Sequence, residues 1–223
     1  MRVMLSNKSF DLEGQDHFFK VASMEGKYEE KDGVIPDAGA FLLSVLERIL
    51  KENADSPEAV ALSDLLAFQV LTMSETGEPV GPATTRHVFP LPRKINGGTK
   101  IQTFITDSCK QSRDLMISKP KYLLMVVVRE KTTYMTHMDF DHEKPVSLDL
   151  NPAGIFDKQH TGEAVGRVTA QVCGTIALVN KASHVCRAGG LLWECHVPHV
   201  PQISKDEKDK DRVSVALFRL NDE

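Results

Sequence analysis

Two stretches of the chain place apolar side chains at helical intervals. Between residues 38 and 53, apolar positions recur every three to four residues with polar residues between them, which is typical of an amphipathic helix. The following NADSPE resembles a helix cap with Pro57 in the first turn, so a shorter helix is expected to run toward Leu66. The apolar positions of the first helix are Phe41, Leu42, Val45, Leu46, Ile49 and Leu50.

Beyond these helices the pattern changes to the alternation that is typical of strands. Segments 67–74 and 83–91 are predicted to form two strands, with Gly77 supplying the turn between them. The NGG sequence before segment 99–106 favours a turn, because asparagine and glycine tolerate positive φ, and a third strand is expected to follow it. The three segments together predict a β-meander.

The stretch ITDSCKQSRD, residues 105–114, is predicted to lead from the third strand into a helix that begins after Asp107. That helix is expected to end near Lys119, since Pro120 disfavours helix at the residue before it. Hydroxyls and cations at a strand-to-helix turn suit a phosphate, because the first N–H groups of a helix lack internal partners and carry partial positive charge. The alternative is an ordinary helix cap at Asp107 or Ser108 with a solvated polar face.

Strands dominate the second half of the chain. Segment 121–130 is apolar enough for a strand buried on both faces, and segment 131–138 is its expected hairpin partner. Segment 139–162 holds two prolines and many turn formers, and a long loop is predicted there. Short strands, hairpin turns and few helices indicate an antiparallel barrel or sandwich with helical decoration. The remaining strands are predicted at 166–179, 191–197 and 212–220.

Composition sets the class of protein and its surroundings. The 223 residues suffice for one large domain at 38–223, and residues 1–37 lack clear periodicity, so a loosely packed N-terminal extension is expected there. A net charge of -4 gives no reason to expect nucleic acid or an anionic membrane as partner. Four irregularly spaced cysteines and an apolar run limited to residues 123–128 indicate a cytoplasmic protein with free thiols.

Several short motifs follow one another in an informative order. They are the turn ETGEP, the Arg86-His87-Val88 strand, the Ile105-Thr106-Asp107 turn, the Lys119-Pro120 pair and the hydrophobic LLMVVV. In this order they resemble the pyridoxamine 5'-phosphate oxidase-related proteins, a family of FMN-binding split barrels. The resemblance implies a mainly β fold, a six-stranded antiparallel split β-barrel with helical decoration. It also implies a homodimer that holds FMN in a cleft between its subunits.

The resemblance further implies an FMN site and a chemistry. The phosphate is expected near the R-x-V strand and the TD turn, with Gln171 approaching the flavin ring from a later strand. The family's R-S-x-K pattern falls on residues 109–112, where the charges are displaced rather than absent. The implied activity is an FMN-dependent oxidoreductase with an unassigned substrate and no identified catalytic residue. The expected phosphate and ribityl contacts are Arg86, Val88, Thr106, Ser108, Lys110 and Ser112, with Arg113 in reserve.

Three other interpretations of the sequence stay open. A flavin-free dimeric split barrel that binds or scaffolds other molecules becomes the better hypothesis if Arg86, Lys110 and Ser112 do not converge. Cys109 at a helix N-terminus beside Lys110 would have a lowered pKa, as a nucleophile requires. The SHVC and ECHVPH segments gather histidines and cysteines, but they lack the paired spacing of structural zinc sites. No metal is therefore predicted.

Overall fold

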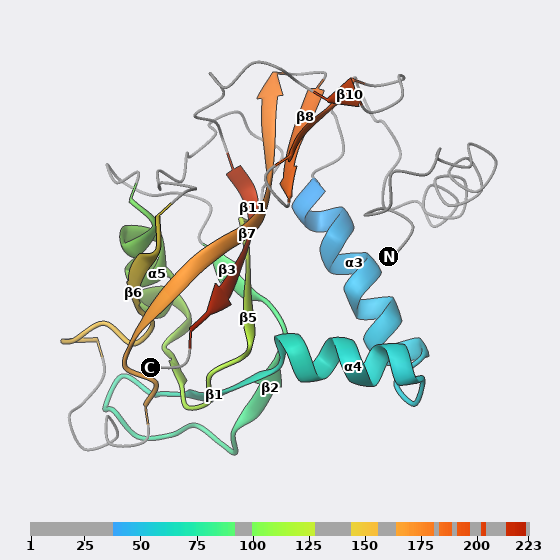
Figure 1. The fold of residues 1–223 in the computed structure, drawn as a ribbon. Helices are drawn as coiled ribbons and strands as arrows, with labels where there is room; N and C mark the ends of the chain where they lie inside the picture. The colour runs from blue at the N-terminus through green and yellow to red at the C-terminus, as the bar shows by residue number, and fades with distance from the viewer. Residues whose placement is uncertain are drawn as a thin grey trace, which may run out of the picture. The chain divides into compact units, whose positions relative to one another are not determined.

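The chain divides into two compact units, Met1–Pro36 and Asp37–Glu223, and every described element belongs to the second. Figure 1 shows its helices beside a long curved sheet. No helix in the described ranges is long and apolar enough to cross a bilayer. The computed structural model describes residues 38–91, 100–127, 144–155, 164–180, 183–188, 191–196, 202–203 and 213–221.

The first two helices form as their sequences predict. Helix α3 covers Ala38–Glu52 and helix α4 covers Pro57–Leu66. The Ser56 hydroxyl accepts a hydrogen bond from the Ala59 N–H at 3.1 Å, which satisfies one of the unpartnered N–H groups at the start of α4. Apolar side chains of both helices pack against the larger sheet in a cluster of buried residues, Leu46, Leu66, Leu124, Val126 and Val215.

A small antiparallel sheet follows the helices. Strand β1, Phe68–Thr72, lies between β2, Thr84–Arg86, and β4, Asp114–Met116. The single strand predicted over 83–91 is wrong, because the chain leaves this sheet after Arg86 and forms β3, Phe89–Leu91, in the larger one. Burial explains the change: all three β2 residues are exposed, whereas Phe89 and Leu91 are buried.

The larger sheet has the order β10-β9-β8-β7-β11-β5-β3, and β6 pairs with β7 off this path. Strand β3 runs parallel to β5, while the other pairs are antiparallel, so the sheet is mixed. The described chain is thus mainly β with few helices, as predicted. The strands are β5 (Tyr122–Val127), β6 (Val146–Asp149), β7 (Arg167–Asn180), β8 (Ser183–Ala188), β9 (Leu191–His196), β10 (Gln202–Ile203) and β11 (Val213–Leu220).

Two predictions for the second half of the chain need comment. A continuous loop over 139–162 is wrong in part, since β6 lies inside it and pairs with the start of β7. Leu148 and Leu150 supply the reason, because both are fully buried in the core and draw this segment onto the sheet. The hairpin partner predicted at 131–138 lies outside the described residues.

Helix α5 overturns the central local prediction of the sequence. It covers Ile101–Ser112, so the strand predicted at 99–106 and the helix predicted to begin after Asp107 are both wrong. Arg113 ends the helix in the left-handed conformation, at φ 53°, and β4 follows at once where the predicted helix was to continue. Spacing by three and four explains the helix: the buried positions are Ile101, Phe104, Ile105, Ser108 and Cys109.

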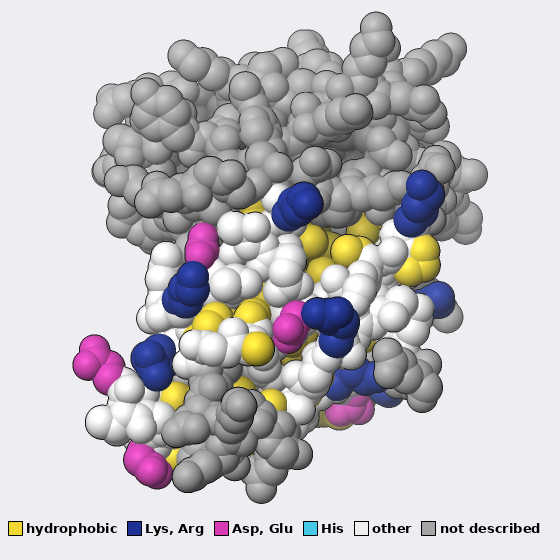
Figure 2. All heavy atoms as spheres, turned by 90° about the vertical axis from the view of Figure 1, so that its left-hand side faces the viewer, with side chains coloured by type: hydrophobic (Ala, Val, Ile, Leu, Met, Phe, Trp, Pro, Cys, Tyr) yellow, Lys and Arg dark blue, Asp and Glu magenta, His cyan; other side chains and the backbone are white. Residues whose placement is uncertain are grey.

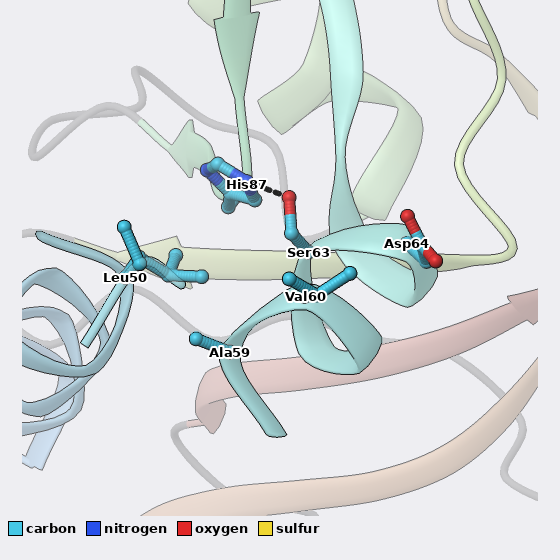
Figure 3. A pocket seen from close by; sticks show the side chains of 7 residues that line it. Leu50, Ala59, Val60, Ser63, Asp64 and His87 are labelled. Atoms are coloured by element: carbon cyan, nitrogen blue, oxygen red, sulfur yellow. Dashed lines mark hydrogen bonds between the residues drawn. The ribbon is translucent and has the colours of Figure 1, made fainter. Parts of the chain in front are cut away.

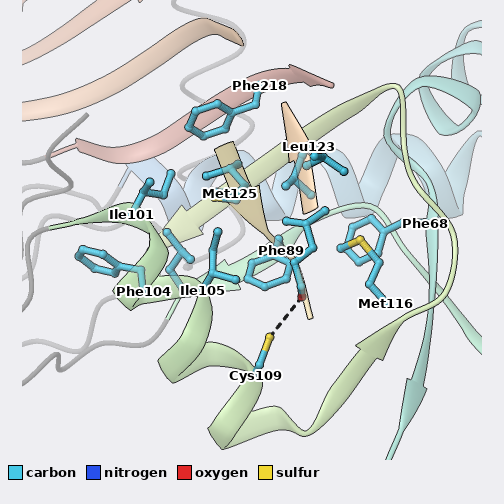
Figure 4. Packing of buried hydrophobic residues seen from close by; sticks show 14 of the residues in the cluster. Phe68, Phe89, Ile101, Phe104, Ile105, Cys109, Met116, Leu123, Met125 and Phe218 are labelled. Carbon is cyan, nitrogen blue, oxygen red and sulfur yellow. Dashed lines mark hydrogen bonds between the residues drawn. The ribbon is translucent and has the colours of Figure 1, made fainter. Parts of the chain in front are cut away.

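The main core forms where α5 packs against both sheets. Figure 4 shows Phe104, Ile105 and Phe89 of this core beside Met125 and Phe218 of the larger sheet. Phe104 and Phe218 are both completely buried. Burial of side chains this large stabilises the domain more than any surface contact does, so the position of α5 is fixed by its apolar face.

Candidate functional site

Four of the residues expected to bind FMN lie around one hollow. Its volume is only about 10 Å³, which is roughly the space that one water molecule needs. Strand β2, the link to β3 and the last turns of α5 bring these residues together. The expected residues in its lining are Arg86, Val88, Ser108 and Ser112.

The polar groups around this hollow already have partners. Arg86 Nη2 lies 3.1 Å from Asp114 Oδ2, and the Thr72 hydroxyl donates to Asp114 Oδ1 at 2.6 Å. The Asp114 side chain is 15% exposed and that of Arg86 42%. The Ser108 hydroxyl donates to the Pro90 carbonyl at 2.5 Å. The Ser112 hydroxyl accepts from the Asp114 N–H at 3.2 Å. The arginine's charge is therefore compensated, and both serine hydroxyls are engaged.

The other expected residues do not join this hollow. Thr106 donates to the Gln102 carbonyl one turn earlier in α5, at 2.8 Å. Lys110 is exposed on the last turn of the same helix, where a cation complements the helix dipole. Arg113 donates from Nε to the Met73 carbonyl at 3.2 Å. Gln171 lies on β7 opposite Arg219 of β11.

These positions bear on the fit of an FMN phosphate. Residues 105–112 lie in the middle and at the C-terminal end of α5, where backbone carbonyls carry partial negative charge. The carboxylate of Asp114 adds a full negative charge beside Arg86. A phosphate dianion needs unengaged N–H groups and cations instead. The groups around this hollow, as they are paired here, do not offer a phosphate those partners, and FMN binding stays a prediction from the sequence.

Cys109 also differs from its sequence-based interpretation. The residue is 1% exposed, and its sulfur lies 3.5 Å from the Leu150 carbonyl oxygen. Figure 4 shows Cys109 on α5 beside the buried apolar side chains. Burial, followed by the negative charges of Asp114 and Asp149, raises the pKa of Cys109 to about 12. The lowered pKa expected at a helix N-terminus is wrong, because the residue lies in the third turn of α5. The thiol is not an activated nucleophile.

A second hollow lies between the end of α3, helix α4 and the turn after β2. Its volume is about 230 Å³. Figure 3 shows the Ser63 hydroxyl on α4 pointing at the ring of His87, and the Ser63 Oγ to His87 Nε2 distance is 2.9 Å. Burial lowers the pKa of His87 below its ordinary value of 6.5. The hollow is lined by Leu50, Ala54, Ala59, Val60, Ser63, Asp64 and His87.

The Ser63–His87 pair does not amount to a catalytic triad. A hydrolytic serine needs a histidine that a third group orients. Asp64 is the acidic residue that lines this hollow, and in Figure 3 its carboxylate points away from His87. The pair therefore forms a neutral polar wall of the hollow. Sequence reasoning missed it, because Ser63 and His87 are 24 residues apart and meet only when β2 turns back past α4.

Comparison with known proteins supplies the fold and nothing closer. No family model matches the sequence, and no curated protein matches it. A chain of the yeast SAGA DUB module with a mutant Sgf73 is 11% identical with a TM-score of 0.56, covering 92% of this chain and 52% of that one. A chain of the SAGA DUB module bound to ubiquitin aldehyde is 12% identical with a TM-score of 0.55, and the match covers 85% of this chain and 50% of that one. An essential yeast splicing factor is 11% identical with a TM-score of 0.53, and the match covers 93% of this chain and 53% of that one.

The chain thus spans about half the length of these solved chains. At 11 to 12% identity the likeness concerns the backbone fold of that half. It carries no residue-level correspondence to any binding or catalytic group, so the chemistry of this chain has to be argued from its own side chains.

Proposed function

We propose that this chain is a flavin-free protein-binding module that works by contact with other proteins. The observation that carries the proposal is the ion pair between Arg86 and Asp114, at 3.1 Å, beside a hollow of about 10 Å³. The arginine that the sequence offers to a phosphate thus has a carboxylate as its partner. Lys110, the second expected cation, does not line this hollow. Because Lys110 does not join Arg86 and Ser112 at this hollow, the flavin-free alternative is favoured.

Cavity size is consistent with a binding function that uses an exposed surface. Two hollows in the described part of the chain measure about 230 and about 10 Å³. Pockets for cofactors and drug-sized ligands span roughly 300–1,000 Å³ and bury most of the ligand's surface. A binding function that uses an exposed surface needs no such cavity.

The structural neighbours suggest that the fold is used in assemblies of several proteins. One of them belongs to a module of four named proteins, Ubp8, Sgf11, Sus1 and Sgf73, and in one structure that module is bound to ubiquitin aldehyde. Ubiquitin is accordingly the protein partner that we propose to test first.

Two finer predictions from the sequence stay proposals. A six-stranded antiparallel split barrel is one of them, and the parallel pairing of β3 with β5 counts against a purely antiparallel arrangement. A homodimer is the other, and the mass of the protein in size-exclusion chromatography with light scattering would test it. An FMN-dependent oxidoreductase activity stays the competing proposal, favoured by the gathering of Arg86 and Ser112 at one hollow.

The first experiment measures flavin retention. The purified protein is incubated with excess FMN, passed over a desalting column and examined by visible absorbance. We expect no flavin band with the protein, in either the wild type or an Asp114→Asn variant that would release Arg86 from its partner. Stoichiometric flavin in the wild type, lost in Arg86→Ala, would overturn the proposal and establish a flavoprotein.

The second experiment tests the partner. Titration of the protein into ¹⁵N-labelled ubiquitin should produce saturable chemical-shift changes confined to one face of ubiquitin, as a specific interface requires. Changes that are absent at millimolar protein would remove ubiquitin as the partner. The matched control is protein that has been unfolded in urea, alkylated at its cysteines and then returned to buffer. This protein should not bind ubiquitin.

A further inference from the structure

The hollow beside Ser63 and His87 has the features of an anchor site for one side chain. Its apolar lining comes from the end of α3, the link between the helices and the first turn of α4, and consists of Leu50, Ala54, Ala59 and Val60. The remaining wall is the hydrogen-bonded Ser63–His87 pair. Figure 3 shows the apolar side chains below this pair and the histidine ring above the helix.

Size and polarity narrow the group that would fill the hollow. About 230 Å³ is below the range of small-molecule pockets and suits a single large side chain. Aromatic residues with a polar edge serve as anchors of protein interfaces, because they place an apolar body in a pocket and a hydrogen-bonding tip against its polar wall. Tyrosine combines these properties, with its hydroxyl facing Ser63 and His87.

The rim of the hollow carries negative charge. Asp64 lines it directly, while Asp55 and Glu58 are the chain neighbours of lining residues in the same turn region. All three carboxylates are exposed, and none forms an ion pair with another described residue.

The nearest cations of α3 do not offset this charge. Arg48 pairs with Glu52, and Lys51 pairs with Glu47, each within the helix. Burial also favours the uncharged form of His87. The rim is therefore net negative, and a partner of opposite charge is favoured.

We propose that this hollow binds a tyrosine side chain presented by a Lys/Arg-rich segment of a partner protein. The apolar walls hold the ring, and the Ser63–His87 pair meets the phenol hydroxyl. The carboxylate of Asp64, with the exposed Asp55 and Glu58 next to lining residues in the chain, attracts the neighbouring cations. The exposed Val60, with 48% of its surface accessible, extends the apolar contact at the mouth of the hollow. This inference rests on the proposed protein-binding function and names its surface.

Fluorescence anisotropy with a labelled peptide tests the proposal. The probe is an amidated Lys-Lys-Tyr-Lys-Lys peptide, and the comparison peptides carry Ala in place of Tyr, or Glu in place of every Lys. We expect saturable binding of the tyrosine–lysine peptide, with each comparison peptide weaker by about tenfold or more, a ratio that corresponds to about 1.4 kcal/mol. Equal binding of the alanine peptide would overturn the anchor, and equal binding of the glutamate peptide would overturn the charge argument.

Variants locate the site on the protein. Val60→Lys places a cation at the mouth and should weaken the tyrosine peptide by about tenfold or more, while Val80→Lys is the matched control. Val80 is also an exposed valine, at 66%, and it does not line the hollow. Both substitutions are at the surface, and circular dichroism checks that both variants fold. An equal loss of affinity in the two variants would place binding elsewhere.

The outcomes separate this inference from the proposed function. A protein that retains FMN defeats the proposed function, whatever the peptide does. A flavin-free protein that perturbs ubiquitin but shows no preference for the tyrosine–lysine peptide keeps the proposed function and defeats only this site.

Discussion

The Asn151 side chain connects its own segment with Met116 and Val165, and its removal should lower the stability of the fold. Its Nδ2 group donates to the carbonyls of Met116, at 2.8 Å, and Val165, at 2.7 Å. Its Oδ1 accepts the Met116 N–H at 2.8 Å. Asn151 thus takes the place of a neighbouring strand along the outer edge of β4. An Asn151→Ala substitution removes all three bonds at once.

The magnitude follows from these bonds. Each contributes about 1 kcal/mol net to folding, and a buried N–H left without a partner costs about 1–3 kcal/mol. Met116 is 1% exposed, so its N–H is buried and depends on this partner. Its carbonyl keeps one partner, the Val165 N–H at 2.9 Å. We expect Asn151→Ala to lower the free energy of unfolding by about 3 kcal/mol.

Urea unfolding followed by circular dichroism measures this loss. With a slope of about 1–3 kcal/mol/M, the midpoint should fall by roughly 1–3 M. Asn53→Ala is the matched control, since Asn53 is exposed and surface substitutions usually change stability by about 0.5 kcal/mol or less. A midpoint for Asn151→Ala equal to that of Asn53→Ala would refute the reasoning and show that solvent replaces the asparagine.

Three further outcomes are expected. Phe104→Ala, at a side chain with no exposed surface, should lower the free energy of unfolding by about 3–5 kcal/mol in the same assay. Because the pKa of Cys109 is raised to about 12, iodoacetamide should leave this thiol unmodified in the folded protein and alkylate it in urea, as peptide mass spectrometry would show. Burial lowers the pKa of His87 below 6.5 in the folded protein. As the pH falls, the imidazole is therefore protonated in the unfolded chain before it is protonated in the folded one. The contribution of His87 to stability should therefore hold above about pH 6.5 and decline below it, and a His87→Gln variant should lack this component of the decline.

Where local pattern and burial agree, the sequence predicted the fold well. Helix α4 begins at Pro57 because Ser56 caps it, and the sequence alone indicates both the cap and the proline. Strand β5 is buried along nearly its whole length, as the unbroken apolar run LLMVVV indicates. Strand β7 fills the predicted segment almost residue for residue.

Helix α5 shows why the rest was missed. The letters IQTFIT alternate in part and include two isoleucines and two threonines, which favour strands by propensity. The same letters also place Ile101, Phe104 and Ile105 at helical spacing, and packing against two sheets selects that pattern. Because the predicted phosphate cradle depended on a strand-to-helix turn at Asp107, one error of local structure moved the candidate site. The hollow at His87 requires contacts between distant segments, which no local pattern reveals.

Backbone chemical shifts of residues 101–106 test the central claim most directly, since the strand-to-helix turn predicted to hold a phosphate requires a strand where α5 lies. The account predicts helical Cα and carbonyl shifts that run without a break from Ile101 to Ser112. Extended shifts over 101–106, followed by helical shifts only after Asp107, would contradict it and restore the strand-to-helix turn that a flavin phosphate needs.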